Sequence, residues 1–194
     1  MRKSILAVSL GILVIFLPTV VKAADVTYSV SQSIGAAGSV TGSITTDGST
    51  GVLGTSNIVD WNLVLNDGTN PTFTLAGSSN SEEEVIGSDL TATATQLLFN
   101  YSGSDEGWFL LESLTIGDLG PFVCWEASTA CSTAVAGASL ATQDGEADIV
   151  YTALSGEGVI GTASAAPTPE PESLFLLGTG LVGLAGMGWR RFAS

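Results

Sequence analysis

An alternation of apolar and polar residues through the middle of the chain constrains its fold more than any other feature. Val26, Tyr28 and Val30 alternate with polar residues, and Val59, Trp61, Leu63 and Leu65 share a second such face. The same pattern recurs at 39–45 and 97–101, and further strands are expected at 108–116 and 148–154. A period of two puts successive side chains on opposite faces of a strand, so one face of each segment should be buried.

Turn-forming pairs separate these segments. Asp47-Gly48, Asn66-Asp67-Gly68 and Ser155-Gly156 suit tight turns, because glycine adopts positive φ without steric cost. No amphipathic helical pattern of useful length precedes residue 172. Residues 24–162 are therefore expected to form an all-β domain, an antiparallel β-sandwich of about eight to ten strands. A jelly roll or a partly closed barrel is the alternative.

Positive charge is confined to the two ends of the chain. The five basic residues are Arg2, Lys3, Lys22, Arg190 and Arg191, there is no histidine, and the net charge is −14. No cation in the predicted domain can neutralise phosphate, which excludes nucleic acid as a partner. Without histidine in the chain or lysine in the predicted domain, there is no Ser-His-Asp triad and no amine nucleophile there, so no enzyme activity and no cofactor are expected. A carboxylate-dependent glycosidase is the least favoured alternative.

Residues 1–23 have the pattern of a secretory signal peptide. Arg2 and Lys3 precede an apolar run from Ile5 to Leu17, and small residues stand before a cleavage point expected between Ala23 and Ala24. The alternative is an uncleaved anchor, but the run is shorter than the roughly 20 residues of a spanning helix.

Two cysteines, Cys124 and Cys131, are separated by six residues. In an exported protein this spacing favours a disulfide that closes a loop. A metal pair or free thiols are the alternatives, and a zinc site would need two further ligands, which could only be carboxylates.

Aromatic and acidic residues offer weaker candidate sites. Most aromatic side chains fall in alternating runs typical of a core, and Trp125, beside Cys124, is the best candidate for an exposed ring that stacks on a sugar. This underlies an alternative function as a carbohydrate-binding, lectin-like domain. Asp144, Glu146 and Asp148 resemble the start of a calcium loop, but the later ligand positions do not fit. Glu82-Glu83-Glu84 is expected to lie in a mobile loop.

The last part of the chain reads as a linker followed by a membrane segment. Residues 163–172 contain Pro169, Glu170 and Pro171, and the two prolines favour an extended backbone. Residues 173–194 are predicted to form a short transmembrane helix that ends at Arg190 and Arg191. Because positive residues stay cytoplasmic, the domain should face outward.

Pro-Glu-Pro, a short Leu/Gly-rich segment and a terminal arginine pair resemble the PEP-CTERM sorting signal, here over residues 167–192. The chain departs from the pattern only in Phe192-Ala193-Ser194 after the arginines. The resemblance implies that an exosortase-type membrane enzyme of Gram-negative bacteria recognises Pro169, Glu170 and Pro171, after the helix has held the precursor in the inner membrane. It also implies association with extracellular polysaccharide or biofilm. We therefore expect an exported, non-enzymatic cell-surface or matrix protein.

Overall fold

The computed structural model describes residues 23–103, 106–114, 120–129, 131, 136–143 and 149–164. These residues form strands and two short 3-10 turns, with no α-helix among them. The strands are β1 (Val26–Ile34), β2 (Gly38–Thr46), β3 (Gly51–Val52), β4 (Ile58–Asn66), β5 (Phe73–Ala76), β6 (Ser81–Ile86), β7 (Leu90–Ala92), β8 (Gln96–Asn100), β9 (Trp108–Ser113), β10 (Phe122–Glu126), β11 (Gly137–Ala141), β12 (Val150–Ala153) and β13 (Glu157–Ala163). The 3-10 turns are Thr55–Asn57 and Gly77–Ser79.

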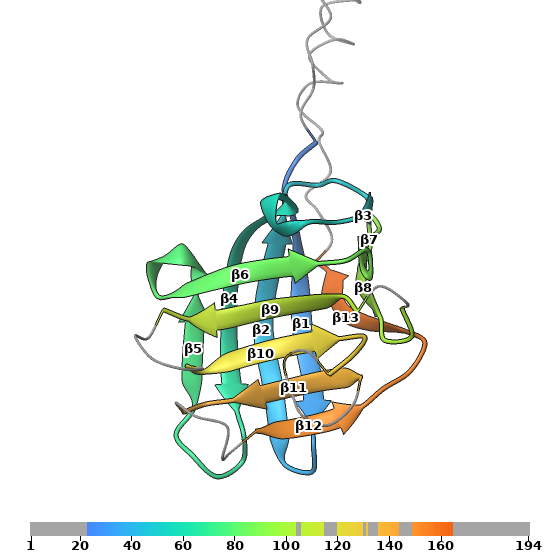
Figure 1. Cartoon of the computed structure of the whole chain (residues 1–194). Coiled ribbons are helices and arrows are strands. Elements are labelled where there is room, and N and C mark those ends of the chain that lie inside the picture. Colours follow the sequence, from blue (N-terminus) through green and yellow to red (C-terminus); the bar gives the residue numbers. More distant parts are fainter. Residues whose placement is uncertain are drawn as a thin grey trace, which may run out of the picture.

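The strands form two antiparallel sheets. The eight-stranded sheet has the order β3-β7-β8-β13-β1-β2-β4-β5, and the five-stranded sheet has the order β12-β11-β10-β9-β6. Figure 1 shows the five-stranded sheet lying across β1, β2 and β4 with its strands at a steep angle to theirs. Strands adjacent in sequence pair in β1-β2, β4-β5, β7-β8 and from β9 to β12, whereas the pairs β3-β7, β8-β13, β13-β1, β2-β4 and β6-β9 join strands separated along the chain. Two stacked antiparallel sheets are consistent with the predicted β-sandwich.

The main hydrophobic core lies between the two sheets, as the alternation predicts. Its largest fully buried side chains are Trp125, Tyr28, Phe99 and Phe109, which come from both sheets. The apolar faces of β1 and β4 meet those of β9, β10 and β11 in this core. Burial of these side chains drives the association of the sheets.

The prediction of the buried face is wrong for one residue. Val59 was expected beside Trp61, yet Val59 is 44% exposed and Ile58 is buried. The cause is a bulge in the β2–β4 pair, where Thr45 is opposite Asp60 but Thr46 is opposite Ile58. An extra residue in one strand reverses the facing of those that precede it, and the alternation in the sequence does not reveal it.

The membrane segments expected from the sequence lie outside the described residues. Residues 1–22 and 165–194 are not described, so the signal peptide and the C-terminal helix stay predictions. In the part of the chain that the structure does describe, no helix is long and apolar enough to cross a membrane.

Asp67, in the turn after β4, joins the two sheets through hydrogen bonds. Its Oδ1 accepts from the backbone N–H groups of Thr69 (2.8 Å) and Asn70 (2.7 Å). Its Oδ2 accepts from the Asn70 side chain (2.8 Å) and from the hydroxyl of Thr142 (2.7 Å), which follows β11 of the other sheet. Burial acts to raise the pKa of Asp67, but the bonds to Asn70, Thr142 and Thr69 outweigh it and hold the pKa well below its usual range.

Replacing Asp67 should therefore destabilise the domain. We expect Asp67→Ala to lower the free energy of unfolding by about 3 kcal/mol at pH 7, because several buried donors lose their acceptor. Because the folded-state pKa is lowered, the contribution of the carboxylate is complete above the unfolded-state pKa of about 4 and is lost as the pH falls below it.

Urea unfolding of the wild type and the variant between pH 7 and pH 2.5 measures both effects. Asp25→Ala, at an exposed position before β1, is the control. Equal stability of wild type and Asp67→Ala at pH 7 would contradict the assigned role.

Candidate functional site

The two ends of the domain lie side by side. β1 and β13 pair antiparallel, with Tyr28 opposite Ala163. The pairing continues past the strand, where the backbone N–H of Ser164 donates to the carbonyl of Thr27 (3.1 Å). Ala23 and Ala24, at the predicted signal cleavage point, are exposed just before β1. The first and last described residues of the domain therefore lie at the same end, where β1 begins and β13 ends.

This geometry bounds the position of the predicted sorting motif. Pro169, Glu170, Pro171, Arg190 and Arg191 lie outside the described residues. Pro169 nevertheless follows Ser164 by five residues, which span at most about 18 Å when fully extended. Chain length alone therefore keeps Pro169 within that distance of Ser164, at the paired ends of β1 and β13.

Trp125 is not an exposed aromatic platform, contrary to the prediction. Its side chain is 0% exposed and stacks on Phe109, with 5.3 Å between ring centroids. Cys124 points to the outer face of the five-stranded sheet, so the next residue along β10 must point into the core. Trp108, on the outer face of β9, is half-buried instead, and its Nε1 donates to Glu84 (3.1 Å).

Trp125 has a hydrogen-bond partner that the sequence analysis missed. Its Nε1 donates to Oε1 of Gln32 (2.7 Å), across the core from β10 to β1. The sequence did contain a signal of this contact, because Gln32 interrupts an otherwise apolar strand face made by Val26, Tyr28, Val30 and Ile34. A polar residue in such a position indicates either a buried partner or a pocket.

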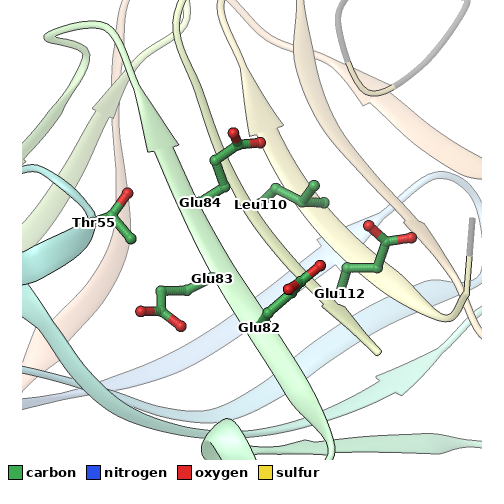
Figure 2. A pocket seen from close by; sticks show the side chains of 6 residues that line it. All are labelled: Thr55, Glu82, Glu83, Glu84, Leu110 and Glu112. Atoms are coloured by element: carbon green, nitrogen blue, oxygen red, sulfur yellow. The ribbon is translucent and has the colours of Figure 1, made fainter. Parts of the chain in front are cut away.

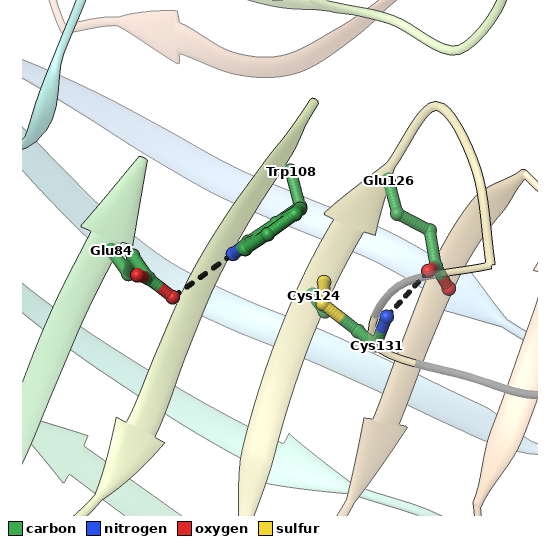
Figure 3. The surroundings of a disulfide bond; sticks show 5 residues. All are labelled: Glu84, Trp108, Cys124, Glu126 and Cys131. Carbon is green, nitrogen blue, oxygen red and sulfur yellow. Dashed lines mark hydrogen bonds between the residues drawn. A yellow bond between two sulfur atoms is a disulfide. The ribbon is translucent and has the colours of Figure 1, made fainter. Parts of the chain in front are cut away.

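The predicted disulfide between Cys124 and Cys131 is present, with 6.2 Å between the two Cα atoms (Figure 3). It holds the chain after β10 against the outer face of the five-stranded sheet, where Phe122, Cys124 and Ala141 form a second small core. Oε2 of Glu126 accepts from the backbone N–H of Cys131 (2.7 Å), which fixes the same loop a second time.

The cysteines do not form a metal site in this oxidised state. The ligand atoms of Cys124, Cys131 and Glu126 lie within 4.8 Å of one another, close enough for a shared ion. Both sulfur atoms are bonded to each other, however, and a metal binds cysteine as a thiolate. The other metal candidate, Asp144, Glu146 and Asp148, lies outside the described residues.

Four glutamates gather on the edge of the five-stranded sheet, on a surface we call the glutamate pocket. Glu82, Glu83 and Glu84 were expected in a mobile loop, but they form the middle of β6, so that prediction was wrong. Their pairing with β9 explains the strand, since Glu82 lies opposite Glu112 and Val85 packs into the core opposite Phe109. The burial of Val85 against Phe109 outweighs the low strand propensity of the three glutamates.

The glutamate pocket has a volume of about 400 Å³ and is lined by Thr55, Glu82, Glu83, Glu84, Leu110 and Glu112 (Figure 2). Partial burial raises the pKa of Glu112, the backbone N–H of Gly120 opposes that rise, and the charges of Glu82 and Glu84 add to it. The hydroxyl of Thr55 already accepts from the N–H of Val85 (2.9 Å). This surface repels anions, and no cationic side chain lines it to orient a substrate.

Loss of the disulfide should loosen the small core without altering the main one. We expect Cys124→Ala with Cys131→Ala to lower the free energy of unfolding by about 2.5 kcal/mol, the loop-closure entropy of a short bridged loop. Urea unfolding of the variant, and of the wild type with and without reductant, measures this loss. If reduction leaves the stability unchanged, the bond does not stabilise the native state.

Replacing Glu112, in contrast to removing the disulfide, should stabilise the domain. Because its pKa is raised, ionised Glu112 destabilises the fold, and Glu112→Gln should gain about 0.5 kcal/mol at pH 7, the scale of a like-charge cross-strand pair. The gain should disappear below about pH 4, where the wild-type carboxyl is protonated in both states. Thermal unfolding against pH measures it, Asp25→Asn is the control, and a gain that persists at low pH would refute this explanation.

Comparison with known proteins identifies the end of the chain. Residues 167–191 match the model of the PEP-CTERM protein-sorting motif. No curated protein and no solved structure matches the chain. The match covers the Pro-Glu-Pro segment, the apolar stretch and both arginines, and it begins three residues after the last described residue. The chain is therefore an exported protein that carries a C-terminal PEP-CTERM sorting motif and is sorted through exosortase.

Proposed function

We propose that the β domain is a non-enzymatic cargo, delivered to the cell surface or the extracellular matrix when exosortase processes the tail, and that it associates there with extracellular polysaccharide. The observation that carries this proposal is the sorting motif at residues 167–191. The motif lies beyond the last described strand, so its removal would leave that strand intact and the domain could be delivered in its folded state.

The position of β13 supports processing after folding. β13 lies between β8 and β1 inside the eight-stranded sheet, so the sheet needs the chain up to Ala163 before it is complete. Pro169 follows Ala163 by six residues. The enzyme can therefore bind an extended Pro-Glu-Pro segment while the domain stays folded.

The charge distribution supports release. The acids are spread along the chain from Asp25 to Glu172, whereas Arg190 and Arg191 are the cations that follow Lys22. A domain without positive charge has no electrostatic attraction to anionic lipid. Removal of the tail thus removes the apolar segment and the positive charge in one step, which leaves a soluble acidic domain.

The described sites support a non-catalytic role. The glutamate pocket offers carboxylates without a cation, and no histidine exists in the chain to act as a general base at neutral pH. The buried position of Trp125 removes the version of a lectin-like function that relied on stacking a sugar on that ring.

Replacing the motif should block sorting. We expect Pro169→Ala, Glu170→Ala and Pro171→Ala together to leave the precursor at full length in the membrane fraction, because the extended recognition segment is lost. Immunoblots of membrane and released fractions, with mass spectrometry of the C-terminus, measure the outcome.

The matched control is Glu172→Gln, which removes one acid two residues beyond Glu170 and leaves Pro-Glu-Pro intact. It should be processed as the wild type is. Normal release of the triple variant, with the same C-terminus as the wild type, would refute a role for this motif.

A further inference from the structure

A second pocket opens between the two sheets, away from the glutamate pocket. We call it the inter-sheet pocket. It lies where β1 and β13 of the eight-stranded sheet face β11 and β12 of the five-stranded sheet, and its volume is about 370 Å³. That volume is within the range of small-molecule sites in proteins. The residues that matter for its chemistry are Gln32, Tyr101, Thr152, Leu154, Glu157 and Val159.

Tyr101 is the most buried polar residue that lines the inter-sheet pocket. It is 3% exposed, and its hydroxyl has no hydrogen-bond partner among the described residues. Burial raises the pKa of the phenol, and the nearby Gln32 side chain opposes that rise. The short hydrogen bonds of Gln32 go elsewhere, because Oε1 accepts from Trp125 (2.7 Å) and Nε2 donates to the carbonyl of Val159 (3.0 Å).

A buried hydroxyl without a partner is costly, by about 1–3 kcal/mol. Such a group needs a partner from outside the chain, which a water molecule or a ligand in the pocket supplies. The Tyr101 ring is held in place by Phe99, with 5.2 Å between ring centroids. Gly158 allows this position, since a Cβ there would lie 2.8 Å from Cε2 of Tyr101.

The rim of the inter-sheet pocket combines apolar surface with hydrogen-bonding groups. Leu154 is 39% and Val159 is 42% exposed, so apolar surface borders the pocket. Glu157 and Ser155 are exposed beside them. Apolar patches interleaved with hydroxyl, amide and carboxylate groups match a molecule that has hydroxyls on its edge and C–H groups on its faces.

Charge selects among such molecules. Residues 24–169 contain no lysine, arginine or histidine, and Glu157 stands at the rim. An anionic ligand would meet a carboxylate and no counter-charge. We infer that the inter-sheet pocket binds a neutral saccharide unit, with the Tyr101 hydroxyl and the Glu157 carboxylate bonding its hydroxyl groups. This rests on the proposed association with extracellular polysaccharide and supplies its site.

The test is a titration of the full chain, purified after export and labelled with 15N, followed by NMR. The probes are methyl α-glucoside, methyl β-galactoside and N-acetylglucosamine, each up to about 50 mM to cover weak affinities. Glucuronate is the anionic counterpart. We expect at least one neutral sugar to shift the signals of Gln32, Tyr101 and residues 152–159, and glucuronate to bind at least about tenfold more weakly.

Two phenylalanine variants supply the comparison. Tyr101→Phe removes the buried hydroxyl and keeps the ring, so we expect at least about fivefold weaker binding with stability unchanged or raised. Tyr151→Phe removes the hydroxyl of a tyrosine that is 50% exposed and outside the pocket lining, and it should bind as the wild type does. Equal affinity of Tyr101→Phe and wild type would overturn the inference.

Other outcomes also count against the inter-sheet pocket. Absence of shifts with all three neutral sugars, shifts confined to the glutamate pocket, or glucuronate binding as tight as the neutral sugars would each overturn it. Sugar binding and tail processing are measured separately, so the two proposals can fail separately. A titration that fails in a normally processed protein refutes the pocket alone, and normal release of the Pro-Glu-Pro variant refutes the sorting mechanism alone.

Discussion

The absence of any cation between residues 24 and 169 is the constraint on which the rest of the structure depends. Carboxylates that lie away from water must be stabilised by neutral donors, since no salt bridge can form there. Asp67 is held by backbone N–H groups and a threonine hydroxyl, and Glu126 and Glu112 accept from the N–H groups of Cys131 and Gly120. These bonds order the loops at the sheet ends, so the acidic residues shape the turns as well as the surface. The same constraint makes both described pockets unsuited to anions.

The pairing of β1 with β13 connects the fold to sorting. It brings the first and last described residues to one end of the domain, and the matched sorting motif begins three residues later along the chain. A sandwich closed by its first and last strands is complete only when the last strand has joined, and the sorting motif begins a few residues later. The sorting motif and the described domain are thus separate along the chain.

Much of the fold could be predicted from the alternation, but its exceptions could not. The facing of Val59 depends on a bulge formed with β2, and the strand that contains Glu82, Glu83 and Glu84 forms because Val85 packs opposite Phe109 on a distant strand. We predicted Trp125 to be exposed because it lies near the disulfide, whereas the alternation of side chains along β10 points it into the core. In the first two cases the deciding contact lies far away in sequence, and local propensity carries no information about it. The disulfide was predictable, because six residues between two cysteines of an exported chain already restrict the partners.

By itself the sequence determined the class of fold, the disulfide, the lack of cations and the sorting motif, because each of these depends on residue type and local spacing. Only the tertiary structure decided that the ends of the domain lie together, that Asp67 bonds across to Thr142, and that Gln32, Tyr101 and Glu157 border one pocket. Those three residues come from positions far apart in the chain. Their convergence follows from sheet order and the stacking of one sheet on the other, which the period-two pattern leaves open.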